Sequence, residues 1–402
     1  MNILLFNAGS SSLKATLMES RDGAVRAHGL VDWAGAATQY EYSNSEGKRA
    51  SEQVPWKGHA EAVRRFVFDL THTKPIALPQ RSALAAVGHR VVHGGPFTSS
   101  VRITPEIRSR ISALADLAPL HNPPSLEALA AAEAELPDVP HVAVFDTAFH
   151  ATLPPEAYTY PVPNRWTQEW GIRRFGFHGL SHAYCARRAA EMLDRRADGL
   201  RLVICHLGHG CSASAVKDGR CVDTTMGFTP LEGLMMATRC GSIDPSIVLH
   251  VQQHRGLTAE QVETALNRES GLLGVSGSTA DMRQVLASAN AGDKQARLAL
   301  DIYVHRVRQA IGAFAVTMGG VDALVFTAGV GEHAAEIRRA VCAGLDCLGL
   351  ELDPDANRTC RPDADVTRKN SRGRILVMTT REDVTMLRDV VHVLENQTNR
   401  TN

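Results

Sequence analysis

The stretch ILLFNAGSSSLKATLM spans residues 3–18 and has the pattern of a buried strand, a turn of small residues and a second strand. A later stretch repeats the pattern, because LVICHLGHG at 202–210 is followed by SAV at 214–216. The two stretches share little sequence identity, so chance and an internal duplication both explain the likeness. They predict a strand with a glycine-rich end near the beginning of the chain and another near its middle.

Other segments extend this pattern to the rest of the chain. Short apolar runs at 142–145 and 323–326 end in polar or glycine-rich turns, which is typical of buried strands. Apolar residues recur every three or four positions at 303–318 and at 384–394, which predicts helices there. The sequence therefore predicts an α/β protein of two similar halves, with a boundary after Asp146, before a proline-rich stretch.

The composition is that of a globular protein. The chain has 402 residues, of which 44% are hydrophobic and 21% charged, and its 43 Lys and Arg balance 43 Asp and Glu. Balanced charge gives no electrostatic reason to expect nucleic acid or a membrane as a partner. We also expect no transmembrane span and no signal segment. Eight cysteines without a Cys-x-x-Cys pair indicate free thiols in a reducing cytoplasm.

Two segments have the chemistry of anion binding. The turn at 7–14 combines backbone N–H groups, three serine hydroxyls and Lys14, which suits an oligophosphate, although it is not a P-loop and an ordinary β-turn has the same composition. In GHRVVHGG at 88–95, Arg90 lies next to apolar residues and can present its planar guanidinium to a carboxylate or phosphate. The alternative is a surface arginine at a strand end.

Histidine pairs raise the question of zinc. His178 and His182 have the i, i+4 spacing of helical zinc ligands, but no Glu follows the first of them. His206, His209 and Cys211 also have ligand-like spacing, but no second cysteine pair completes a site. These histidines are therefore better explained without zinc.

Two further segments are ambiguous. The stretch 223–239 is dense in Gly, Thr and Met, which indicates an ordered loop of the kind that often carries function. Thr379 and Glu382 have capping-box spacing, so Glu382 caps a helix, lies near Mg²⁺, or does both. No Gly-x-Ser-x-Gly, Gly-x-Gly-x-x-Gly or His-Arg-Asp set occurs, which counts against a hydrolase, a Rossmann dehydrogenase and a protein kinase.

Taken together, these segments resemble the acetate kinase (acetokinase) family from Asn7 to about Glu382. The family's signature blocks occur in order: NAGSSSLK at 7–14, GHRVVHGG at 88–95, APLHNPP at 118–124, FDTAFH at 145–150, RRFGFHGLSH at 173–182, HLGHG at 206–210, VDTTMGFTPLEGLMM at 222–236 and FTAGVGEH at 326–333. Any one block is weak; eight in order leave little room for coincidence.

The resemblance implies the fold of the actin, hexokinase and heat-shock-chaperone ATPase superfamily. That fold has two duplicated, actin-like (ribonuclease H-like) α/β domains with an active-site cleft between them. We expect an N-terminal domain at 1–148, a nucleotide-binding and dimerisation domain at 149–382, and a C-terminal helix at 383–402 that packs on the N-terminal domain. The resemblance also implies a homodimer joined through the C-terminal domain.

The implied reaction is reversible, in-line phosphoryl transfer from ATP to acetate, which gives acetyl phosphate and ADP. Such a reaction needs positioning and charge stabilisation more than covalent chemistry. The resemblance assigns the catalytic roles to Arg90, Asp146, His178 and Arg239. It assigns Asn7 and Glu382, with Asp146, to the environment of Mg²⁺, for which Mn²⁺ can substitute, held partly through water.

The resemblance also implies the substrate contacts. Acetate is expected in a pocket of Val92, Leu120, Phe177 and Pro230, beside Arg90. Glycines at 329 and 331 are expected to leave room for the base and ribose of the nucleotide. The nucleotide contacts are expected from residues in four segments: Ser12, Lys14, His206, Leu207, Gly208, His209, Gly210, Asp281, Met282, Arg283, Gly329, Val330, Gly331 and His333.

The chain departs from the family pattern at several positions. His209 and His333 stand where Asn is usual, and Ser242 where Asp is usual beyond Arg239. We expect charge on these histidines to vary near pH 6.5, so that ATP affinity falls as pH rises through neutrality. Two alternatives stay open: a propionate or butyrate kinase of the same fold, and a weakly catalytic sensor of nucleotide or acetyl phosphate.

Overall fold

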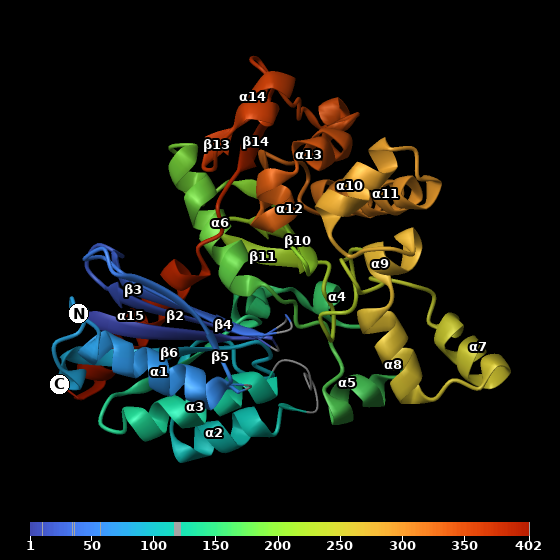
Figure 1. Cartoon of the computed structure of the whole chain (residues 1–402). Coiled ribbons are helices and arrows are strands. Elements are labelled where there is room, and N and C mark those ends of the chain that lie inside the picture. Colours follow the sequence, from blue (N-terminus) through green and yellow to red (C-terminus); the bar gives the residue numbers. More distant parts are fainter. Residues whose placement is uncertain (10, 34, 36, 57, 116–121, 402) are drawn as a thin grey trace. The chain divides into compact units, whose positions relative to one another are not determined.

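The computed structural model describes residues 1–9, 11–33, 35, 37–56, 58–115 and 122–401. The chain divides into two compact units, which are shown in Figure 1. Unit 1 comprises Met1–Ala148 and Arg381–Asn402, and unit 2 comprises Phe149–Thr380. The domains expected from the sequence, at 1–148, 149–382 and 383–402, also carry functional roles, and these roles stay predictions. The α/β fold class is confirmed, because each unit is built on its own mixed sheet.

Unit 1 contains an eight-stranded sheet in the order β5-β4-β3-β2-β1-β6-β8-β7. Strands β1, β6 and β8 are parallel, and the remaining neighbours are antiparallel. The elements are β1 (Asn2–Ala8), β2 (Ser12–Glu19), β3 (Val25–Asp32), β4 (Thr38–Asn44), β5 (Arg49–Val54), α1 (His59–His72), β6 (Leu84–Val91), β7 (Val101–Arg102), α2 (Pro105–Ser112), α3 (Asn122–Glu135), β8 (His141–Phe145) and α15 (Glu382–Thr401).

Helices cover both faces of this sheet, which is why its strand β1 has a continuous apolar run at residues 3–6. Leu4 and Phe6 face α1 and α3, and the ring of Phe6 meets that of Phe66 edge-on at 6.5 Å. Leu5 points to the opposite face, where α15 packs on β1, β6 and β8. A Cβ at Gly88 would lie 2.7 Å from Val390 of α15 and 2.8 Å from Leu5, so glycine permits this close approach.

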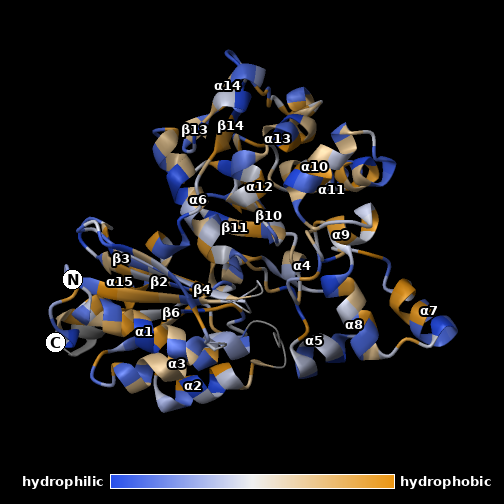
Figure 2. Ribbon diagram, viewed as in Figure 1, coloured by the Kyte–Doolittle hydropathy of each residue, from blue (hydrophilic) through white to orange (hydrophobic). Residues whose placement is uncertain are grey.

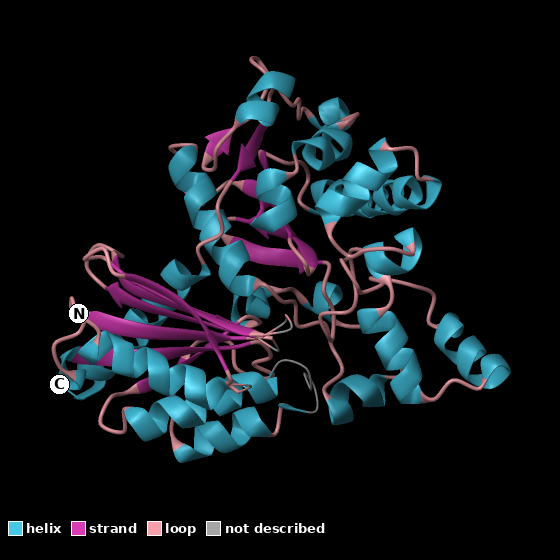
Figure 3. Cartoon of the chain, in the orientation of Figure 1, coloured by secondary structure: helices cyan, strands magenta, loops and turns pink. Residues whose placement is uncertain are grey.

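Unit 2 contains a six-stranded sheet in the order β11-β10-β9-β12-β14-β13 (Figure 3). Its elements are α4 (Pro155–Tyr158), α5 (Asn164–Trp170), α6 (Gly179–Met192), β9 (Arg201–Leu207), β10 (Cys211–Lys217), β11 (Arg220–Thr224), α7 (Ser246–Arg255), α8 (Ala259–Arg268), α9 (Gly271–Ser276), α10 (Met282–Asn290), α11 (Lys294–Thr317), β12 (Ala323–Thr327), α12 (Ala328–His333), α13 (Ala335–Cys342), α14 (Pro354–Thr359), β13 (Ala364–Asp365) and β14 (Arg374–Val377). Helix α6 packs on β9 and β12, and α11 packs on β9 and β10.

The two sheets have the same core topology. In unit 1 the order β3-β2-β1-β6-β8-β7 has the same sequence of antiparallel and parallel neighbours as β11-β10-β9-β12-β14-β13 in unit 2. This topology supports duplication over chance as the source of the repeated pattern at 3–18 and 202–216. It also shows that the run at 323–326 corresponds to β6, whereas the run at 142–145 corresponds to β14.

Two features concern the chain as a whole. All eight cysteines are free thiols, five of them buried and Cys347 exposed. Among the described helices, none combines the length and the apolar character that a bilayer span needs.

Candidate functional site

In unit 1, the predicted site residues gather at one edge of the sheet. Asn7 lies one residue before the end of β1, Arg90 lies one residue before the end of β6, and Asp146 directly follows β8. Because these three strands are parallel neighbours, their carboxyl ends lie side by side. This is the edge at which α/β proteins bind ligands.

Arg90 is the centre of this group. Its Nε donates to Asp146 Oδ1 at 3.1 Å, its Nη2 donates to Asp146 Oδ2, and its Nη1 donates to Asn7 Oδ1 at 2.9 Å. Burial disfavours the charged guanidinium, but Asp146 and Glu382 outweigh that effect and raise the pKa of Arg90. Burial also raises the pKa of Asp146, against the opposing charge of Arg90. Arg90 is therefore a fixed cation in a nearly closed environment.

Glu382 completes the group from the other end of the chain. It is the first residue of α15, its Oε2 accepts from Asn7 Nδ2 at 3.2 Å, and the same oxygen lies 3.9 Å from Arg90 Nη1. Of the two roles left open for Glu382, the capping box with Thr379 does not match the helix start, because α15 begins at Glu382 and a capping-box Glu is the third residue of its helix.

The remaining predicted residues of unit 1 lie near the same edge. In the turn between β1 and β2, Gly9 N donates to the carbonyl of Ser12 at 2.8 Å. Lys14 is exposed and pairs in register with Asn7. Val92 directly follows β6 and is buried. Leu120 lies outside the described residues.

In unit 2, the two glycine-rich segments meet at the carboxyl ends of β9 and β12. These strands are parallel, with His206 in register with Thr327. A Cβ at Gly208 would lie 3.5 Å from Ala328 Cβ, so the turn at 206–210 packs against the start of α12. The structure therefore brings together two of the four predicted nucleotide segments.

The room expected at 329 and 331 is only half present. A Cβ at Gly329 would meet nothing within 4 Å, but one at Gly331 would lie 3.3 Å from the backbone carbon of Phe326. Glycine at 331 therefore also serves the packing of α12 on β12, and the expectation that it leaves space for a nucleotide stays a prediction.

His178 lies beside the turn at 206–210. Its ring stacks on that of His206 with centroids 4.2 Å apart, and its Nδ1 lies 2.9 Å from Ser212 Oγ. It precedes α6 in a left-handed conformation, with φ 57°. Such a conformation costs a non-glycine residue about 1–3 kcal/mol and is found mostly at functional sites.

Arg239 lies close to the same turn. Its Nη1 donates to the carbonyl of Pro230 at 2.9 Å and lies 3.7 Å from the sulfur of Met236. Within the described ranges no acidic side chain forms an ion pair with it, and burial lowers its pKa. A half-buried guanidinium without a carboxylate partner favours an anionic ligand.

Ser242, which stands where Asp is usual, bonds elsewhere. Ser242 Oγ accepts from Gly233 N at 3.1 Å, and Ser242 N donates to the carbonyl of Gly233 at 2.9 Å. Arg239 is therefore oriented through the carbonyl of Pro230, without an acidic neighbour.

A network missed by sequence reasoning fixes the loop that carries Pro230. Glu232 accepts from the hydroxyl of Tyr160 and, at 2.8 Å, from Arg174 Nη2. The Tyr160 hydroxyl accepts from Phe228 N at 2.8 Å, and Arg174 also donates to three carbonyls at the start of the loop. No local pattern in the sequence indicates this network, because only the fold brings position 160 to position 232. Phe177, the other expected pocket residue of unit 2, is buried.

Other predicted nucleotide residues are not joined to this group. Asp281 caps α10 by accepting from Arg283 N at 2.8 Å, and the same two side chains form an ion pair. No hydrogen bond in the described part of the chain links either to residues 206–210 or 329–331. Met282 is buried in α10, and His333 ends α12.

His209 differs from the expectation made for it. Burial and the charge of Arg239 lower its pKa below the usual 6.5. The imidazole is therefore neutral at neutral pH, and the expected loss of ATP affinity as pH rises through neutrality has no basis in this residue.

Arg338 was not predicted, yet it holds one nucleotide segment in place. This fully buried side chain donates from Nη1 to the carbonyls of Gly331 and Glu332, both at 2.8 Å, and from Nε to Asn357 Oδ1 at 2.7 Å. A buried arginine was not recognisable in the sequence, because Arg338 and Arg339 look alike there.

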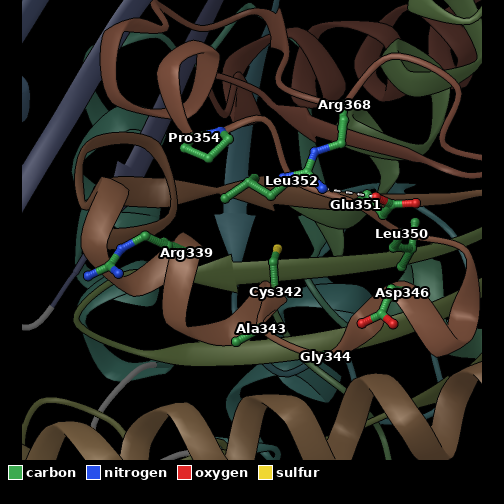
Figure 4. Close-up of a pocket in the computed structure, with 10 residues that line it drawn as sticks. All are labelled: Arg339, Cys342, Ala343, Gly344, Asp346, Leu350, Glu351, Leu352, Pro354 and Arg368. Carbon is green, nitrogen blue, oxygen red and sulfur yellow. Dashed lines mark hydrogen bonds and ion pairs between the residues drawn. The ribbon is translucent and has the colours of Figure 1, made fainter.

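A separate hollow of about 500 Å³ lies near the end of α13 (Figure 4). Arg339, Cys342, Glu351 and Arg368 are among the residues that line it, and Arg368 pairs with Glu351 at 3.2 Å. In the figure, the side chains of Arg339 and Arg368 do not converge. None of the predicted site residues lines this hollow.

Comparisons with known proteins agree with this geometry. The model of the acetokinase family matches residues 2–388. An acetate kinase of Cyanothece sp. is 45% identical over 98% of this chain and 99% of its own length, and one of Thermoanaerobacterium thermosaccharolyticum is 44% identical over 98% and 100%.

Solved structures are similar over the same extent. Acetate kinase of Porphyromonas gingivalis superposes with a TM-score of 0.90 at 37% identity, covering 98% of this chain and 99% of that one. A propionate kinase of Francisella tularensis gives 0.89 at 36% identity, covering 96% and 98%.

Proposed function

The chain belongs to the acetokinase family, and on this premise we propose that it catalyses reversible phosphoryl transfer between ATP and acetate, with acetyl phosphate and ADP as products. The family model and the similar proteins confirm the family resemblance noted in the sequence, and the chain is a phosphotransferase with a carboxyl group as acceptor. The observation that carries the proposal is Arg90, a partly buried cation held by Asp146 and Asn7 at the ligand-binding edge of its sheet.

The chemistry follows from the charges that the residues supply. A carboxylate oxygen of acetate forms a bond to the γ-phosphorus as the bond to the bridging oxygen of ADP breaks. Negative charge on the transferring group is stabilised by Arg90 of unit 1 and by Arg239 and His178 of unit 2. Each fixed donor of this kind contributes about 3–4 kcal/mol to the transition state.

A divalent cation fits this site through water. Among the described residues, no group of three or more His, Cys, Asp or Glu is arranged to hold a metal. The oxygens of Asp146 and Asn7 already accept from Arg90. We propose that Asp146, Asn7 and Glu382 would hold hydrated Mg²⁺, or Mn²⁺ in its place, through water. The cation would neutralise phosphate charge when bound.

The acyl pocket is proposed to include Val92, Phe177 and Pro230. Val92 and Phe177 are buried, and Pro230 is fixed by the network of Tyr160, Arg174 and Glu232. An apolar pocket separates acids that differ by one methylene only by about 1–3 kcal/mol. Acetate is therefore the preferred acid, and propionate a poorer one.

The nucleotide is proposed to bind to unit 2, at the turn 206–210 and the segment 327–331. Both lie at the carboxyl ends of parallel strands, and both offer backbone N–H groups in glycine-rich turns. Ser12 and Lys14 of unit 1 remain candidates for phosphate contacts. Asp281, Met282 and Arg283 remain candidates for contacts with the adenosine.

A second copy of this chain is the proposed partner of unit 2. Helix α7 has no buried residue, and its Ile247 and Leu249 are 47% and 56% exposed. Figure 2 shows hydrophobic residues along this helix. Large apolar side chains that are exposed on one helix form a surface that a second copy can cover. We place the protein in the cytoplasm, where its free thiols stay reduced.

The test is to trap acyl phosphate with hydroxylamine, using purified protein, Mg²⁺ and ATP, with acetate, propionate and butyrate in parallel. Product with acetate, less with propionate and none when pyrophosphate replaces ATP would support the proposal. More product with a longer acid would favour the propionate or butyrate kinase. ATP binding without product from any acid would favour the sensor.

A further inference from the structure

A single hydroxyl joins two imidazoles next to the proposed phosphoryl site. Ser212 Oγ lies 2.9 Å from His178 Nδ1 and 2.7 Å from His182 Nε2. Ser212 and His182 are fully buried, so this geometry is fixed by packing on β10 and α6. Both distances are those of good hydrogen bonds.

A serine hydroxyl has one proton, so it can donate to only one of the two rings and must accept from the other. In the first arrangement His182 Nε2–H donates to Ser212, and Ser212 donates to His178 Nδ1. In the second arrangement both directions are reversed, and His182 carries its proton on Nδ1. The two arrangements place the proton of His178 on opposite ring nitrogens.

His182 decides between them. Burial lowers its pKa well below the usual value, so the ring is neutral and carries one proton. Its Nδ1 is buried and has no hydrogen-bond partner in the described part of the chain. The second arrangement would bury an unpaired N–H donor, which native proteins rarely tolerate. The first arrangement leaves only an unpaired lone pair.

From this geometry we propose that Ser212 and His182 are positioning residues that hold His178 as the Nε2–H tautomer. Nδ1 of His178 then accepts from Ser212, and Nε2–H remains as a donor on the other side of the ring. A Cβ at Gly210 would lie 3.3 Å from His178 Nε2 and 3.7 Å from Arg239 Nη1. The two donors therefore flank the same small space beside Gly210.

This proposal rests on the proposed function, because the Nε2–H donor is useful only if a phosphoryl oxygen lies beside Gly210. The wrong tautomer would present a lone pair to that oxygen and repel it. The same principle explains why a hydrogen-bonded partner that fixes a histidine tautomer matters in other enzymes.

The test combines spectroscopy with kinetics on the full-length protein. In histidine-¹⁵N-labelled protein, long-range ¹H–¹⁵N spectra report which nitrogen of His178 carries the proton, and His178→Gln assigns the signal. We expect the Nε2–H form in the unchanged protein and a mixture of tautomers in Ser212→Ala. We also expect kcat to fall about 10-fold or more in Ser212→Ala, with smaller changes in KM for acetate and ATP.

Matched variants separate positioning from packing. Ser212→Thr keeps the hydroxyl on a strand and should restore both the tautomer and most of kcat. Ser214→Ala removes another buried hydroxyl of β10, one that bonds Thr224 at 2.9 Å, and should change neither. An Nδ1–H His178 in the unchanged protein, or an Ser212→Ala protein with unchanged tautomer and kcat, would overturn the proposal. A protein that makes no acyl phosphate would defeat the proposed function, while the spectra would still decide the tautomer.

Discussion

Both carboxylate oxygens of Asp146 accept hydrogen bonds from the guanidinium of Arg90, and Asn7 takes a third N–H from the same group. A planar guanidinium held by three hydrogen bonds cannot rotate, so the part that makes none of these bonds faces one fixed direction. A lysine would keep the charge and lose that orientation.

Arg90→Ala is therefore expected to lower kcat for acetyl phosphate formation by about 100-fold or more. Arg90→Lys should recover only a small part of the loss, because an ammonium group cannot make the two parallel bonds to Asp146. The matched control is Arg81→Ala, which removes an ion pair with Glu135 on the surface of unit 1 and should leave kcat unchanged. Near-normal turnover of a folded Arg90→Ala protein would remove Arg90 from the mechanism.

Val92→Ala is expected to raise the ratio of kcat/KM for propionate to that for acetate by about 10-fold, because the smaller side chain makes room for one methylene. Competition between the two acids in the hydroxylamine assay measures this ratio. Val91→Ala makes the same chemical change one residue earlier, in the core of unit 1, and should leave the ratio unaltered. If the ratio of kcat/KM values changed equally in both variants, the cause would be looser packing of unit 1 and not the pocket role proposed for Val92.

The KM for ATP is expected to stay constant between about pH 6.5 and about pH 8 as far as His209 is concerned. Its pKa is lowered below the usual 6.5 by burial and by Arg239, so the neutral imidazole predominates in this range and little positive charge is left to disappear as pH rises. Measuring KM across the range in the unchanged protein and in His209→Asn checks this. A rise with pH that His209→Asn abolishes would show that the histidine titrates near neutrality after all.

Arg338→Met should destabilise the protein by about 2 kcal/mol or more, because it leaves buried carbonyls of Gly331, Glu332 and Asn357 without donors. The KM for ATP should also rise, since the carbonyl of Gly331 belongs to the proposed nucleotide segment 327–331. Arg339→Met is the control: it changes the adjacent, exposed arginine beside the hollow of Figure 4 and should alter neither denaturation midpoint nor KM. Equal effects from both changes would contradict the assignment.

Leu249→Asp should convert a dimer to a monomer, because it places a charge in the apolar face of α7 that the second copy is proposed to cover. Light scattering after size exclusion measures the mass. Val316→Asp places the same charge at another exposed apolar position, on α11, and should leave the mass unaltered. A monomeric unchanged protein would end the proposal of a homodimer.

The strands and helices with a strong local signal were predictable from the sequence. The apolar runs at 3–6, 202–205 and 323–326 lie in β1, β9 and β12 because both faces of these strands are covered, which makes the run continuous. The periodic segment at 303–318 lies in α11 up to Thr317, and the one at 384–394 lies in α15; both helices bury one side, which gives the helical period. The two-residue strands β7 and β13 were not predictable, because they are too short to have a pattern.

The site was predictable only where its residues lie at or directly after the ends of strands. Asn7, Arg90 and Asp146 meet because parallel strands end together, which strand order alone determines. Ser212 was missed, although the alternation of Ser212 and Ser214 in a buried strand placed both hydroxyls on one face. Its role depends on the distance from β10 to His178 and His182, which local sequence does not contain.

Unit 1 contains both ends of the chain, and this has a consequence during synthesis. Strands β1, β6 and β8 leave the ribosome early, but α15, which covers one face of them, is made last, and Glu382 arrives with it. Unit 2 can complete its core while one apolar face of the sheet of unit 1 is still uncovered. The half of the protein that is translated first is therefore finished last, and a prematurely terminated chain is left without Glu382.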